Sequence, residues 1–105
     1  MKKGHLIFIF TAVVILTGSS ALAAGKSSVE VGKKLFNDPA LGGSTNETTC
    51  NSCHKNGEGL EKAGSNPKLV KVINQCITGQ LKGEKIDGRT VEMRSLKMYI
   101  KSLGN

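Results

Sequence analysis

Two cysteines and a histidine at a fixed spacing carry the chemistry of this chain. Residues 48–57 read TTCNSCHKNG, so Cys50 and Cys53 lie three positions apart and His54 follows directly. C-x-x-C-H is the attachment motif of c-type haem. One helical turn places both sulfurs along the porphyrin edge, where they form thioethers with its vinyl groups, and the histidine lies beneath the iron. The motif predicts one covalent haem c, bound through Cys50 and Cys53, with His54 as proximal iron ligand.

The second axial ligand of the iron is not specified by this motif. A second histidine is excluded, because the only other one, His5, lies in an N-terminal segment that we expect to be removed. Cys76, Met93 and Met98 remain, with a lysine or an open position as lesser alternatives. Methionine suits an electron-transfer haem, whereas Cys76 is left unpaired once the motif has used the other cysteines. Met98 falls on the solvent side of its helix, which leaves Cys76 and Met93.

The N-terminal segment has the pattern of a secretory leader. Two lysines precede an apolar run from Leu6 to Leu16, and small residues follow at the cleavage region. The run is shorter than the about 20 residues that a membrane-spanning helix needs. We therefore predict a signal peptide over residues 1–23, cleavage after Ala23, and a periplasmic or otherwise exported domain over residues 24–105.

The exported part is small for a domain with a purely apolar core. It contains no tryptophan and one tyrosine, and Phe36 is its one phenylalanine. A covalently held haem would supply the large apolar object that such a core lacks. The composition therefore agrees with the cofactor that the motif predicts.

Helices are the elements that must position these residues, and no strand pattern is evident. Ser27-x-x-Glu30 is a capping box that opens a first helix, which ends near Asn37 ahead of Pro39. The C-x-x-C-H motif should form a short helical turn, because its residues must face one object. The glycine-rich segment 55–65 reads as a loop, and so does the basic segment 79–89.

Two further helices present apolar faces. Asn66 as cap and Pro67 at the first position begin one of them, and Gly79 ends it. Its apolar face carries Leu69, Val72, Ile73 and Cys76. The last helix runs from Thr90 to Leu103. Its apolar stripe consists of Met93, Leu96, Ile100 and Leu103, with Tyr99 at the edge.

Over residues 24–105 the chain resembles the small mono-haem c-type cytochromes. The resemblance rests on the C-x-x-C-H motif, on Gly32 and Phe36 in the first helix, and on Leu96, Tyr99 and Ile100 in the last. It implies an all-α, cytochrome c-like helical domain around one haem. It also implies that the terminal helices cross closely at Gly32, as a residue without Cβ permits.

The C-terminal half is similar to a segment of thiosulfate dehydrogenases and related sulfur-oxidising cytochromes. The shared pattern is I-N-x-C at Cys76, a loop of small residues, then E-M at Met93 and an aromatic residue at Tyr99. In that family the cysteine is the distal haem ligand, which implies His54/Cys76 ligation here, with Met93 as the alternative. The arginine that follows that cysteine in the family is replaced by Gly79 and Gln80. The chain also resembles small His/Cys-ligated cytochromes of anaerobic ammonium-oxidising bacteria, which often form heterodimers and bind small gases.

These observations favour an exported electron-transfer cytochrome, and we predict no catalytic residue. A gas-binding or sensing haem protein for NO or CO is one alternative, and a relative of a sulfur-oxidising cytochrome enzyme is another. The formal net charge of +7 falls to +5 when the two leader lysines are removed. This scattered positive charge favours an acidic redox partner protein. A heterodimer or a homodimer is a further alternative for its assembly. The sequence contains no nucleic-acid-binding motif, and we expect no nucleic-acid partner.

Overall fold

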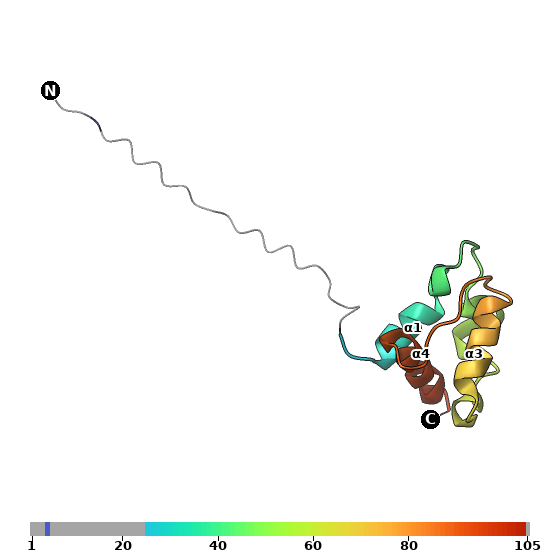
Figure 1. The fold of residues 1–105 in the computed structure, drawn as a ribbon. Coiled ribbons are helices and arrows are strands. Elements are labelled where there is room, and N and C mark those ends of the chain that lie inside the picture. Colours follow the sequence, from blue (N-terminus) through green and yellow to red (C-terminus); the bar gives the residue numbers. More distant parts are fainter. Residues whose placement is uncertain (1–3, 5–24, 105) are drawn as a thin grey trace.

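The computed structural model describes Gly4 and residues 25–104. Apart from Gly4, the predicted leader and its cleavage site after Ala23 lie outside the described residues. Residues 25–104 contain no strand and form helices α1 Val29–Phe36, α2 Cys50–Cys53, α3 Leu69–Thr78 and α4 Val91–Ser102 (Figure 1). Short 3₁₀ turns lie at η2 Leu41–Gly43, η3 Lys55–Gly57 and η4 Ala63–Ser65. The predicted all-α class is therefore confirmed. Within this range, no helix is long and apolar enough to cross a membrane.

The first and last helices of the domain, α1 and α4, cross at very close range (Figure 1). A Cβ atom at Gly32 would lie 2.0 Å from the carbonyl oxygen of Ser95 and 2.7 Å from the Cβ of Tyr99. Only a glycine fits in this space. Phe36 and Tyr99 pack edge to face, with ring centroids 5.1 Å apart and planes inclined by 62°. The predicted crossing at a glycine is confirmed.

The start of α1 differs by one residue from the prediction. Ser28 rather than Ser27 caps the helix, because its backbone is extended and its Oγ accepts a hydrogen bond from the Val31 N–H at 3.1 Å. The N–H of Ser28 donates to the Oγ of buried Ser95 on α4, also at 3.1 Å. A contact 67 residues away in the chain therefore selects between two adjacent serines.

The helix that carries Cys76, α3, begins later than Asn66 and Pro67 predicted. The Oδ1 of Asn66 accepts a hydrogen bond from the Lys68 N–H at 2.9 Å, and its carbonyl accepts one from the Leu69 N–H at 3.1 Å. These bonds close a turn that leads into the helix. Gly79 ends α3 as predicted. The buried residues of α3 are Leu69, Ile73 and Ile77.

The last helix, α4, matches its predicted pattern. Thr90 caps it, and its Oγ1 accepts a hydrogen bond from the Met93 N–H at 3.1 Å. Met98 is 39% exposed, as expected for the solvent side. The predicted stripe is buried, with Leu103 partly covered at its end: Met93, Leu96, Tyr99 and Ile100.

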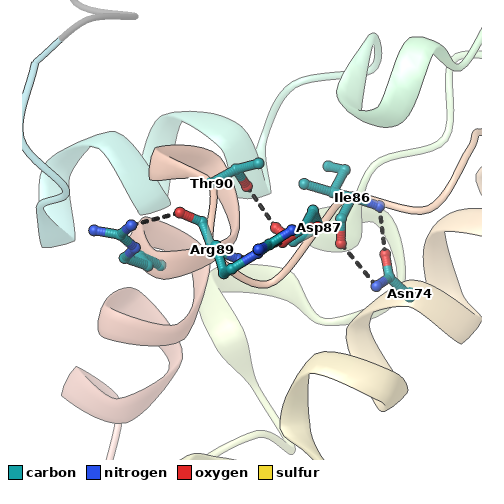
Figure 2. A network of polar contacts seen from close by, with 6 residues as sticks. Asn74, Ile86, Asp87, Arg89 and Thr90 are labelled. Atoms are coloured by element: carbon teal, nitrogen blue, oxygen red, sulfur yellow. Dashed lines mark hydrogen bonds and ion pairs between the residues drawn. The ribbon is translucent and has the colours of Figure 1, made fainter.

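The segment 79–89 contains no helix, yet it is tied to α3 (Figure 2). The side chain of Asn74 pairs with the backbone of Ile86: its Nδ2 donates to the Ile86 carbonyl at 2.9 Å, and the Ile86 N–H donates to its Oδ1 at 2.8 Å. Asp87 then forms an ion pair with Arg89 at 3.0 Å. The hydroxyl of Thr90 donates to the Asp87 carbonyl at 2.7 Å. These contacts guide the chain from α3 into α4.

Candidate haem-binding site

The C-x-x-C-H motif forms the one-turn helix α2, and its own neighbours hold it in shape. Thr49 caps the turn through a reciprocal pair: its Oγ1 accepts a hydrogen bond from the Ser52 N–H at 3.2 Å, and the Ser52 Oγ accepts one from the Thr49 N–H at 3.0 Å. The Oδ1 of Asn51 accepts a hydrogen bond from the Asn56 N–H at 2.8 Å, which ties α2 to η3. Hydrogen bonds within the segment 49–56 therefore hold the motif turn in shape.

An apolar cleft lies above this turn, and it gathers most of the predicted site residues. Cys50, His54 and Cys76 all line it, from α2, from the end of the motif and from α3. The walls are apolar and come from α1, α3, α4 and the segment between η3 and α3: Phe36, Leu60, Ala63, Leu69, Val72, Ile73, Leu96 and Ile100. Val72, one turn before Cys76, is 44% exposed. Three helices and the motif turn thus converge on one cleft.

The three thiols lie in different surroundings. Cys50 is buried, and burial, together with the nearby Cys76, raises the pKa of its thiol to about 11. Cys76 is half-buried, and burial followed by the proximity of Cys53 raises its pKa as well. Cys53 itself is exposed and does not line the cleft. Both motif thiols therefore lie near Cys76.

His54 has one ring nitrogen engaged in a hydrogen bond. Its Nδ1 lies 3.0 Å from the carbonyl oxygen of Glu58. A carbonyl can only accept, so Nδ1 carries a proton, and in the neutral imidazole the lone pair that can bind a metal ion is on Nε2. The Gly57 N–H donates to the His54 carbonyl at 2.8 Å, and this turn brings the Glu58 carbonyl back to the ring. These backbone contacts therefore orient the His54 ring so that Nε2 is the nitrogen that can bind a metal ion.

The two candidates for the sixth ligand lie in different places. Cys76 lines the cleft that His54 enters, whereas Met93 is 0% exposed and is not part of the cleft lining. Met93 packs in the core with Leu96 and Ile100, inside the apolar stripe of α4. Met98 is on the outer side of the same helix. Of the sulfur residues outside the motif within residues 25–104, only Cys76 lines the cleft.

Sequence reasoning missed two wall residues and the partner of His54. Leu60 and Ala63 lie in the segment read as a loop, and Ala63 belongs to η4. Their signal was weak, because they are isolated apolar residues in a polar stretch without helical periodicity. The Glu58 carbonyl is a backbone group and leaves no trace in the residue pattern. The Thr49–Ser52 capping pair was readable, since Thr-x-x-Ser is a variant of the capping box.

These residues fit a covalently attached haem. Two motif thiols, an imidazole with a free Nε2 and apolar walls are the groups that a c-type haem needs. The cleft has a volume of about 70 Å³, which is below the roughly 300 Å³ of common ligand pockets. Within the described range, no three His, Cys, Asp or Glu side chains gather closely enough to hold a bare metal ion.

An all-α domain with this turn at the base of an apolar cleft is a c-type cytochrome domain. Residues 26–97 match the family described as "Di-haem cytochrome c peroxidase". The chain belongs to this family. No curated protein and no solved structure matches the chain. Family membership implies covalently bound haem c and electron-transfer chemistry. The sequence contains one C-x-x-C-H motif, at residues 50–54.

Proposed function

We propose that this chain is an exported cytochrome that holds one haem c, ligated by His54 and Cys76, and that it transfers electrons. The observation that carries the proposal is the placement of these two side chains in one cleft, from which Met93 is excluded. The likeness of the 73–100 segment to thiosulfate dehydrogenases supports the same ligand pair. Export rests on the predicted leader, and the single haem rests on the single motif.

Each ligand has a distinct role in this proposal. When bound, haem c supplies a one-electron iron couple. His54 would bind the iron through Nε2, because its Nδ1–H donates a hydrogen bond to the Glu58 carbonyl. Cys76 as a thiolate brings a negative charge, which stabilises the ferric form and lowers the reduction potential. The choice of axial ligand tunes haem potentials over about 0.8 V.

The test compares the purified haem protein with Cys76→Ala and Met93→Leu. We expect the thiolate signature in the ferric absorption and EPR spectra to disappear in Cys76→Ala, and the potential to rise. Met93→Leu conserves volume, so it should fold with a loss of less than about 1.5 kcal/mol and keep the spectra. Unchanged spectra in Cys76→Ala, or altered ligation in Met93→Leu, would contradict the ligand assignment.

A carbon monoxide titration of the reduced protein extends this test. If Cys76 stays bound in the ferrous form, carbon monoxide should bind slowly to the wild type and quickly to Cys76→Ala. Equal rates in the two proteins would show that Cys76 does not stay bound to the ferrous iron.

A further inference from the structure

A second hollow lies on the outer side of α3, away from the cleft. This groove has a volume of about 530 Å³ and shares no lining residue with the cleft. Lys68, Lys71 and Lys85 line it, the last of them from the segment 79–89. Cys76 and Val72 lie on the cleft side of the same helix. One helix therefore separates a haem-binding cleft from a basic groove.

The positive charge of the groove is not neutralised by the chain itself. No aspartate or glutamate occurs between Glu61 and Glu84, and none lines the groove. Among residues 25–104 the structure records one ion pair, Arg89 with Asp87. The three groove lysines thus have no carboxylate partner within this part of the chain. A ligand with carboxylates would supply the missing charges.

The groove also offers apolar and amide surface between the lysines. Val70 is partly buried and contributes apolar surface, and exposed Gln75 can both donate and accept hydrogen bonds. The amide of Asn74, by contrast, is already held by the Ile86 backbone, so this wall keeps its shape (Figure 2). This combination suits a segment in which acidic and apolar residues alternate.

We propose that this groove docks an acidic, extended segment of a partner protein. Its concave shape favours a polypeptide over an anionic membrane, because a flat lipid surface would reach the rim and not the floor. The two large apolar side chains that are exposed in the described range are Val72, which lines the cleft, and Met98 on α4. Neither lines the groove, so the groove has no large exposed apolar side chain to insert into lipid.

The test is an NMR titration of the ¹⁵N-labelled mature haem protein with the peptide Glu-Val-Glu-Val-Glu at low salt. We expect the shifted amides to lie in α3 and in the segment 79–89. Replacing Lys68, Lys71 and Lys85 by glutamine should weaken binding by about tenfold, because each exposed charge pair contributes modestly. The matched control replaces Lys26, Lys33 and Lys34, which are exposed on or before α1, and should weaken binding by less than about twofold.

A single substitution tests the groove without removing a lysine. Thr78 is exposed and lines the groove, so Thr78→Glu adds a carboxylate there while every lysine remains. It should also weaken peptide binding. Equal weakening by the two triple variants, or shifts confined to other elements, would overturn the proposal. So would lysine-dependent binding to phosphatidylglycerol vesicles in the absence of peptide binding.

Discussion

At the residue scale, His54 shows how a backbone group can set the chemistry of a side chain. The Nδ1–H of His54 donates a hydrogen bond to the Glu58 carbonyl oxygen, with the two heavy atoms 3.0 Å apart. In the neutral ring, the lone pair is then on Nε2. Nothing in the identity of Glu58 matters here, because the contact is made by its main chain. Sequence patterns therefore predict the ligand and miss the group that orients it.

Asp87 is the residue at which we expect a dependence of stability on pH. Its carboxylate accepts hydrogen bonds from Arg89 at the backbone N–H (2.8 Å), Nε (3.1 Å) and Nη2 (3.0 Å). These contacts lower the pKa of Asp87 from 3.8 to about 2. A carboxyl group with a lowered folded-state pKa stabilises the fold above its unfolded pKa, and this stabilisation is lost as the pH falls through the folded value.

Asp87→Asn should therefore lower the thermal midpoint at neutral pH, and the difference from the wild type should shrink between about pH 4 and pH 2. The effect should be small, because the pair is exposed. Glu47→Gln removes the same charge at another exposed position and serves as the control. A difference from the wild type that stays constant down to pH 2 would speak against this role of the carboxylate.

At the scale of elements, the α1–α4 crossing predicts whether Gly32→Ala stabilises or destabilises the domain. Helix propensity alone makes Gly→Ala stabilising by about 0.5–1 kcal/mol in a helix interior. At Gly32 the new methyl group would meet the Ser95 carbonyl at 2.0 Å. We expect Gly32→Ala to destabilise the domain by about 1–3 kcal/mol or more, as overpacking does.

Chemical denaturation of the haem protein measures this change. Lys33→Ala, at the exposed neighbouring position of α1, should shift stability by no more than about 0.5 kcal/mol. A Gly32→Ala protein at least as stable as the wild type would show that the two helices can move apart at low cost.

The apolar faces of the helices and the start of α4 at Thr90 were readable from the sequence, whereas the starts of α1 and α3 were not. The stripe of α4 and the stop of α3 at Gly79 follow from local periodicity and glycine chemistry. The start of α1 depends on the bond between Ser28 and Ser95, and the start of α3 depends on the turn at Asn66. Both are decided by contacts that helical periodicity does not encode.

At the scale of the whole molecule, the helices are attached unequally. The largest interface joins α1 to α4, and the interfaces of α3 with α4 and η4 are much smaller. We therefore expect α3 to be held less firmly than α1 and α4.

Hydrogen exchange tests whether α3 is held less firmly than α1 and α4. In a Cys50→Ser/Cys53→Ser protein, which cannot attach haem covalently, we expect amides of α3 to exchange faster than those of α1 and α4. Haem attachment should then slow exchange most strongly in α3. Equal protection of the three helices without haem, or fast exchange in all of them, would contradict a core held mainly by the α1–α4 crossing.

The sequence by itself determined the cofactor chemistry, because the spacing of Cys50, Cys53 and His54 is local and one helical turn is enough to present it. It also determined the helical class and the glycine at the crossing. Only the tertiary structure decided which sulfur residue faces the cleft. Cys76 and Met93 both lie on apolar helix faces, and periodicity cannot distinguish a side chain that lines a cleft from one that fills the core. The packing of α4 against α1 and α3 places Met93 in the core and leaves Cys76 at the cleft.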